Sequence, residues 1–142
     1  FAVNSGLEML YISEWGDLQA QVLTDVSGTH RGQSAWFAYS YPWITLKSEF
    51  SLTLGAEWKS RDLVDYYYGV RPREMIDGRP AYTGKSSINS VVRISASRSL
   101  SDRWRVVGVL EREYLGKSIR RSPIIERGIV NTAFLGLYYQ FK

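Results

Sequence analysis

The sequence predicts an all-β fold, an antiparallel transmembrane β-barrel, and three observations lead to this prediction. Apolar and polar residues alternate along much of the chain, most clearly from Ile44 to Lys59, and a period of two is typical of a strand with two unlike faces. That stretch of sixteen residues would span about 50 Å as one strand, which is longer than strands in soluble sheets. Aromatic residues make up 14% of the chain, as suits a barrel with aromatic girdles at both membrane surfaces.

Length and composition exclude several other classes. The chain has 142 residues, enough for a single domain, 1–142, that is a β-barrel or the C-terminal part of one. No run of 18 or more apolar residues occurs, so a membrane helix is excluded, whereas alternating strands fit the mean hydropathy of −0.23. The absence of cysteine excludes disulfides and thiolate metal sites. A net charge of +4 without a basic tract indicates that nucleic acid is not a partner.

The first three expected strands are short runs of alternation. Val3–Ser13 and Leu18–Val26 carry an apolar residue at almost every second position, and the polar turn Glu14–Asp17 separates them. Ser34–Trp43 alternates aromatic residues with small ones. Pro42 cannot donate to a ladder, so the third strand should end beside it.

The next strands flank the longest connection. We expect Ile44–Lys59 to form one strand that continues toward Asp65–Gly69, and the Pro- and Gly-containing segment Val70–Gly84 to form a loop. Ile88–Ser97 alternates again, and Ser99–Asp102 is a tight turn.

The last two strands complete a count of seven. Trp104–Tyr114 alternates, with Arg112 interrupting its apolar face near the end, where a membrane interface would tolerate a cation. Gly116–Gly128 is a polar loop, and Thr132–Phe141 forms an aromatic final strand.

The connections alternate in length, which predicts a topology. Short turns at 14–17, 42–46 and 99–102 alternate with longer loops at 27–32, 69–84 and 116–128. Outer-membrane barrels pair short periplasmic turns with longer external loops and have an even number of strands. If the last of the seven strands ends in the periplasm, the first strand would start outside the cell. An even strand number then requires at least one more strand upstream, so we expect the chain to be the C-terminal part of a larger, even-stranded barrel.

Aromatic residues near both sets of connections predict two membrane girdles. The girdle residues are expected to be Trp15, Trp43, Trp104, Tyr66, Tyr67, Tyr68, Tyr114 and Phe141. The tyrosine run could instead stack on a ligand.

Charged residues on the polar faces of the strands predict an inward-facing network. Facing lipid at the membrane midplane, each Lys or Arg would cost about 2–4 kcal/mol, so this face should look into the barrel. We expect salt bridges that fill a narrow lumen, although an acid/base site or a selectivity device would use the same residues. The residues are Lys47, Glu49, Glu57, Lys59, Arg93, Arg105, Glu111 and Glu113.

Basic residues in the two later loops could contact phosphates of lipopolysaccharide, because arginine suits bidentate phosphate recognition. An ordinary solvated loop would have the same composition. The residues are Arg71, Arg73, Arg79, Lys117, Arg120, Arg121 and Arg127.

A catalytic reading rests on His30, the single histidine, which lies near Asp25, Ser27 and Ser34 in sequence. A Ser/His/Asp triad is defined by geometry and not by closeness in sequence, so we expect a solvated loop histidine. With no cysteine and one histidine, a metal site would rest on carboxylates alone. We therefore expect no enzyme activity, no metal and no cofactor.

Several segments together resemble the MipA/OmpV family of outer-membrane proteins. The resembling segments, in order, are Leu23–Gly28, Asp65–Val70, Arg79–Tyr82, Leu100–Trp104, Tyr114–Gly116, Ser122–Ile124 and Tyr138–Phe141. A departure is Lys142 after Phe141, since such barrels commonly end on the aromatic residue.

The resemblance implies a multi-pass β-barrel in the outer membrane of a Gram-negative cell, in contact with its lipid. It also implies a non-enzymatic scaffold in peptidoglycan assembly that links a lytic transglycosylase, a murein hydrolase, to a penicillin-binding protein, a murein synthase. It supplies no catalytic residues. Two alternatives from other classes are a small-solute porin, with an open lumen, and a soluble lipocalin-like binding protein, whose apolar face would point inward.

Overall fold

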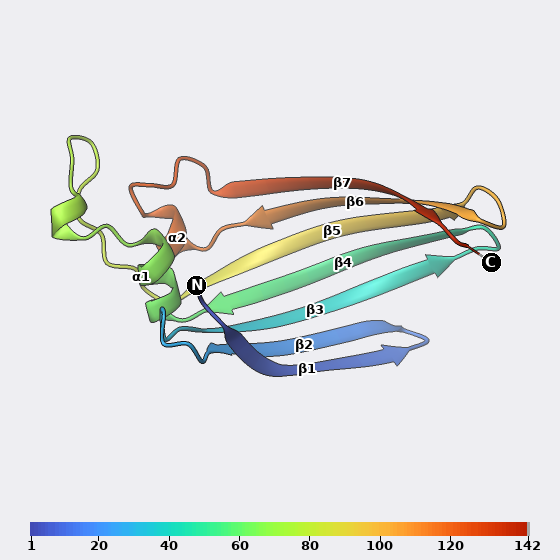
Figure 1. The fold of residues 1–142 in the computed structure, drawn as a ribbon, viewed down its shortest axis with the longest axis horizontal. Coiled ribbons are helices and arrows are strands. Elements are labelled where there is room, and N and C mark those ends of the chain that lie inside the picture. Colours follow the sequence, from blue (N-terminus) through green and yellow to red (C-terminus); the bar gives the residue numbers. More distant parts are fainter. Residues whose placement is uncertain (142) are drawn as a thin grey trace.

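The computed structural model describes residues 1–141 and shows one antiparallel sheet in which each strand pairs with its neighbours in sequence (Figure 1). This confirms the predicted all-β antiparallel class and the count of seven strands. The strands are β1 (Asn4–Ser13), β2 (Gly16–Asp25), β3 (Gln33–Ile44), β4 (Ser48–Lys59), β5 (Ser87–Ser99), β6 (Trp104–Tyr114) and β7 (Ile129–Tyr139).

The strand register gathers apolar residues on one face of the sheet. Phe50 pairs with Ala96, Ala96 with Gly108, and Gly108 with Leu135. A row on the opposite face joins Thr53 to Arg93 and Arg93 to Glu111. A shift of one residue would exchange the two faces, so the hydrophobic pattern fixes the register.

The apolar face is the exposed one. Leu54 is 52% exposed, Leu110 62% and Leu135 79%, whereas Thr53 and Asn89 on the polar face are buried. The sheet therefore does not bury its apolar residues in a core between two layers, as a soluble sheet would. So large an apolar surface is typical of contact with a membrane or another protein.

The sheet is open along both edges. Within residues 1–141 each inner strand pairs with two neighbours, while β1 pairs only with β2 and β7 only with β6. Within these residues the sheet therefore does not close into the predicted barrel.

The prediction of one sixteen-residue strand from Ile44 to Lys59 is wrong, because a hairpin turn divides this stretch between β3 and β4. The Thr45 amide donates to the Ser48 carbonyl at 2.8 Å, and the Ser48 amide donates to Thr45 Oγ1 at 3.0 Å. Ile44 therefore ends β3 opposite Glu49, on the polar face. The twelve residues of β4 still suffice for a tilted membrane-spanning strand, which needs about 9–11.

The expected continuation of this strand toward Asp65–Gly69 is also wrong. Residues Arg61–Tyr68 form helix α1, whose N-cap Ser60 accepts a hydrogen bond from the Leu63 amide. The negative charge of Asp62, in the first turn, interacts favourably with the helix dipole. Among the described residues no helix is long and apolar enough to cross a membrane.

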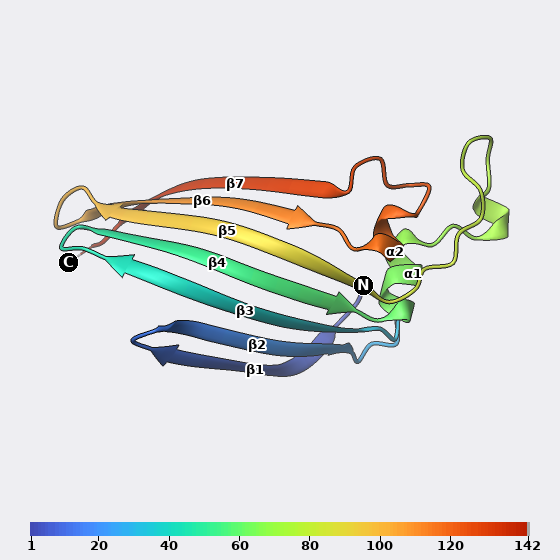
Figure 2. The same ribbon diagram turned by 180° about the vertical axis from the view of Figure 1, so that it is seen from behind.

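The two helices pack together at the end of the sheet that carries the long connections (Figure 2). Helix α2 (Lys117–Arg120) contributes Ile119, which clusters with Val64 of α1 and with Leu115. Ser122 Oγ donates to the Tyr68 carbonyl at 2.6 Å. A short 3-10 helix, η1 (Pro72–Glu74), extends beyond them. The main buried cluster thus ties the long loops to one another.

Candidate interaction surfaces

The polar face of the sheet brings together most of the charged residues predicted for it. Arg93 Nε lies 2.6 Å from Glu111 Oε2, and Lys59 Nζ lies 3.0 Å from Glu57 Oε2 and 3.9 Å from Glu113 Oε1. Arg93 and Glu111 are a register pair of β5 and β6, and Lys59 and Glu57 lie on the same face of β4, while Lys59 reaches Glu113 of β6 across β5. Each of these three carboxylates therefore has a cation beside it, an arrangement that fits a structural role.

Amide and indole groups extend the network beyond the charged residues. Asn89 Nδ2 donates to Glu113 Oε1 at 2.6 Å, and its Oδ1 accepts from the Gly116 amide at 2.8 Å. Trp36 Nε1 donates to Gln19 Oε1 at 3.1 Å. The charge pattern of the sequence does not identify these neutral groups, although their places on the polar face follow from the alternation.

The remaining predicted members of the network lie nearer the short turns. Arg105 Nη1 lies 3.1 Å from Glu49 Oε1 and also donates to Ser97 Oγ at 3.4 Å. Lys47, by contrast, lies in the turn between β3 and β4 and not on a strand. Its assignment to the polar face is wrong, since it depended on the undivided strand.

A pocket of about 350 Å³ opens where the turn between β5 and β6 meets the end of β7. Asp102 and Arg103 line it from the turn, and Tyr138 and Gln140 from the final strand and its extension. The pocket therefore combines an aromatic wall with groups of both charges, at the end of the sheet opposite the helices.

Local contacts hold this turn in one shape. Ser101 Oγ accepts from the amides of Arg103 and Trp104 at 3.3 and 3.2 Å. The Gln140 amide donates to the Arg103 carbonyl at 2.9 Å, and the rings of Trp104 and Tyr139 lie 4.8 Å apart. Such a turn presents its outer side chains on a rigid base.

The predicted girdle residues separate into two groups. Trp15, Trp43 and Trp104 are exposed at the short-turn end, where the ring of Phe141 packs 4.7 Å from that of Tyr139. Tyr114 is exposed at the opposite end of β6. The apolar strand face also carries exposed Trp58 toward the long loops, which the alternation could have identified.

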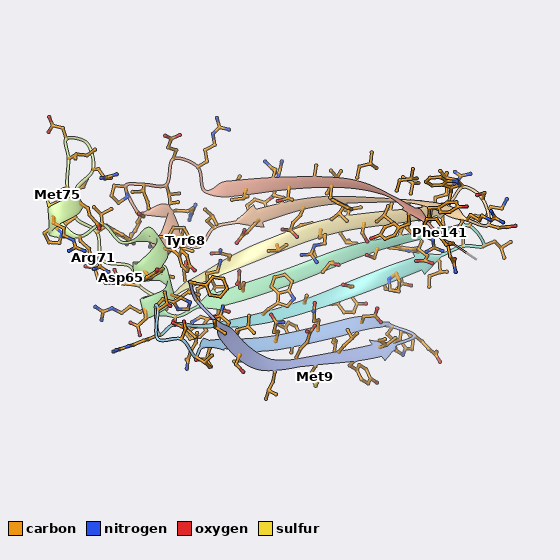
Figure 3. The ribbon with its side chains drawn as sticks, in the orientation of Figure 1. Met9, Asp65, Tyr68, Arg71, Met75 and Phe141 are labelled. Atoms are coloured by element: carbon orange, nitrogen blue, oxygen red, sulfur yellow. The ribbon has the colours of Figure 1, made fainter. Side chains whose placement is uncertain are left out.

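Tyr66, Tyr67 and Tyr68 lie on α1 and not on a strand. Tyr68 packs against the cluster of Val64, Leu115 and Ile119, and Figure 3 shows it among the loops at the helical end. The helix changes which element carries them, and their place in an aromatic girdle stays a prediction.

The basic loop residues lie at the helical end, on several short segments. Arg71 is the N-cap residue of η1, and Arg73 lies within η1. Arg79 Nη2 donates to the Glu74 carbonyl at 2.8 Å. The other four basic residues lie in the connection between β6 and β7. Lys117 and Arg120 belong to α2, and Arg121 and Arg127 follow α2 in the chain.

His30 belongs to the loop after β2 and is buried against α1. Its Nδ1 accepts from the Gly32 amide at 2.9 Å and lies 3.7 Å from Asp25 Oδ2. Its ring lies 5.6 Å from that of Tyr66 and 5.9 Å from that of Tyr67. The expectation of a solvated histidine is wrong, because the ring packs under two tyrosines.

Ser27, one of the two serines near His30 in sequence, does not complete a triad. Ser27 Oγ donates to Asp25 Oδ1 at 2.6 Å, and Asp25 also accepts from the amides of His30 and Arg31 at 2.6 and 2.9 Å. The aspartate thus organises the loop backbone, whereas a triad needs serine bonded to histidine. Within residues 1–141 no group of three or more His, Cys, Asp or Glu side chains could hold a metal ion.

Comparison with known proteins shows similarity to one family. The family described as MltA-interacting protein MipA matches residues 1–141. The MltA-interacting proteins of Escherichia coli (strain K12) and Shigella flexneri are each 24% identical over 142 residues, covering 96% of this chain and 56% of the relative. Outer membrane protein Omp26La of Vibrio anguillarum is 28% identical over 72 residues, 51% of this chain and 28% of the relative. The chain spans about half the length of the first two relatives, and no solved structure matches.

Proposed function

The chain belongs to the MltA-interacting protein (MipA) family, and on this premise we propose that it forms part of an outer-membrane β-barrel that acts as a non-enzymatic scaffold for cell-wall enzymes. The family and the outer-membrane relative support the location. The proposal assigns the exposed apolar face to lipid and the polar face to the inside of the barrel, where the paired charges would be shielded from acyl chains.

Docking of enzymes is assigned to the short-turn end. Long connections and helices occupy one end of the sheet, and the turns after β1, β3 and β5 occupy the other. In outer-membrane barrels the short turns face the periplasm, the compartment in which peptidoglycan is built. A periplasmic partner would therefore meet these turns.

The observation that carries this proposal is the pocket beside the turn between β5 and β6. It is lined by Trp104, Tyr138, Tyr139 and Arg103, and Trp, Tyr and Arg are the residues enriched at interface hot spots. Its rigid base lowers the entropy lost on binding. The pocket would receive one protruding segment of a partner.

The partner proposed is a periplasmic lytic transglycosylase, because the two relatives from Escherichia coli and Shigella flexneri are named as MltA-interacting proteins. Linking that hydrolase to a penicillin-binding protein would make the chain a bridge between cleavage and synthesis of murein. No catalytic step is assigned to the chain itself.

The test compares two charge reversals at opposite ends of the molecule. Asp102→Lys changes an exposed residue of the pocket, and Asp77→Lys changes an exposed residue of the loop between α1 and β5. Binding of the purified transglycosylase to the full-length protein in detergent would be measured by surface plasmon resonance. Asp102→Lys should weaken binding about tenfold, the effect of about 1.4 kcal/mol, and Asp77→Lys should not.

Unchanged binding by Asp102→Lys would place the docking site elsewhere. A loss confined to Asp77→Lys would assign the partner to the helical end and reverse the proposed topology. Heat-dependent gel migration of both variants, as a measure of folding, controls for a general loss of structure.

A further inference from the structure

We propose that the apolar face of β5, β6 and β7 holds one phosphorylated lipid of the lipid A class, with an acyl chain in a groove over Gly108 and a phosphate on Arg112. The choice of an outer-leaflet lipid rests on the membrane topology of the proposed function. The site itself rests on the shape and charge of this face.

The groove consists of two adjoining hollows on the apolar face. One, of about 450 Å³, is lined by Ala96, Gly108 and Leu135, and the other, of about 340 Å³, extends to Arg112 and Asn131. Ile94, Leu110 and Ala133 line both, so the hollows form one continuous channel. An apolar channel that leads to a cation matches the two parts of a phosphorylated lipid.

The hollow exists because a glycine lies among larger residues. Gly108 pairs with Ala96 on one side and Leu135 on the other. A Cβ atom at this position would meet nothing closer than the Phe134 carbonyl oxygen at 3.9 Å and Leu135 Cδ1 at 4.0 Å. Neither crowding nor a positive φ requires glycine here, so the space is left open on the surface.

Arg112 is an exposed cation on a face that is otherwise largely apolar. Its Nε donates to Asn131 Oδ1 at 2.8 Å, which orients the planar guanidinium group. Within residues 1–141 it forms no salt bridge with a carboxylate. A lipid phosphate would supply the missing negative charge, and arginine can bind it through two parallel hydrogen bonds.

The position of Arg112 fits the outer leaflet. It lies two residues before Tyr114, at the end of β6 that meets the long loop, where the cost of a cation on the lipid face is lowest. That loop carries four basic residues, Lys117, Arg120, Arg121 and Arg127, and one acidic residue, Glu126. The carbons of Arg120 lie against Gly128, directly before β7. The same hairpin thus offers further cations for a second phosphate.

The experiment measures binding of diphosphoryl lipid A to the full-length protein in detergent by native mass spectrometry. Arg112→Ala should weaken binding about tenfold, the effect expected when a charged hydrogen-bonding group is lost. Arg98→Ala is the matched control, because Arg98 is an exposed arginine on the same face at the short-turn end of β5. This control should bind as the unmodified protein does.

A second probe separates the two halves of the site. For lipid A without phosphates, Arg112→Ala should have no effect, whereas Gly108→Leu, which fills the groove, should weaken binding of both lipids. Equal binding of diphosphoryl lipid A by Arg112→Ala, or an equal loss with Arg98→Ala, would overturn the proposal. Tighter binding of phosphatidylglycerol than of lipid A would overturn the choice of lipid. Transglycosylase binding by Arg112→Ala, measured separately, reports on the scaffold proposal alone.

Discussion

Asn89 shows how a neutral side chain can organise a charged surface. It is fully buried, donates to Glu113 and accepts from the Gly116 amide. Through these two hydrogen bonds it joins β5 to the end of β6 where the last long loop begins. Charged neighbours such as Arg93 and Glu111 are partly exposed, so water screens their attraction and reduces its contribution to stability.

Replacement of Asn89 by alanine should therefore destabilise the protein more than removal of a surface amide. Asn89→Ala leaves a backbone amide and a carboxylate without their partner, which costs about 1–3 kcal/mol. The free energy of unfolding would be measured by urea titration in lipid vesicles. Asn4→Ala, an exposed site on edge strand β1, is the control, and equal stability of the two variants would contradict the role of Asn89.

Among the secondary-structure elements, the strands could be predicted from the sequence, whereas the helices were not predicted. Alternation identified each strand face because it persists through ten or more residues. Helix α1 was missed because the run Tyr66–Tyr68 favours strand by propensity alone. A signal was present, since Ser60 is an N-cap residue type and Val64 and Tyr68 lie four residues apart, on one helical face.

The turn after β3 was predicted at 42–46, but the structure places it at Thr45–Lys47. Thr45–Lys47 has no glycine or proline, so the usual markers of a turn were absent. The alternation also ran through it unbroken, which placed Ile44 and Lys47 on faces they do not occupy. The pocket at the short-turn end could not be predicted either, because residues distant in sequence, Arg103 and Tyr138, line it together.

The packing of α1 on α2 predicts which residue controls the loop end. Ile119 is fully buried in the cluster with Val64 and Leu115, so Ile119→Ala should cost about 2–5 kcal/mol locally. Limited proteolysis should then cut residues 61–86 and 116–128 faster. Ile124→Ala, at an exposed isoleucine of the same loop, should leave the cleavage rate unchanged; similar rates for the two variants would remove the cluster from this role.

For the whole molecule, we expect one face of the sheet to contact lipid and the other to be shielded from it. Because the chain has no cysteine, a single introduced cysteine can carry a label that tests this expectation. Leu54 and Thr53 are neighbours on β4 with opposite orientations, and their exposures are 52% and 7%. A spin label on Leu54→Cys in lipid vesicles should collide with oxygen, which concentrates in hydrocarbon. A label on Thr53→Cys should not. Equal collision rates measured by electron paramagnetic resonance would contradict the assignment of the apolar face to lipid.

The free edges of the sheet impose an order on assembly. β1 and β7 each present one side of ten or more backbone residues that no other strand contacts within residues 1–141. In hydrocarbon every unpaired amide or carbonyl costs several kcal/mol, far more than the burial of a leucine returns. If the sheet spans the outer membrane as proposed, backbone partners must pair with these two edges before or while it enters the bilayer. Insertion into the membrane and pairing of the two edges would then be one cooperative event. The seven-stranded sheet alone would stay at the membrane surface.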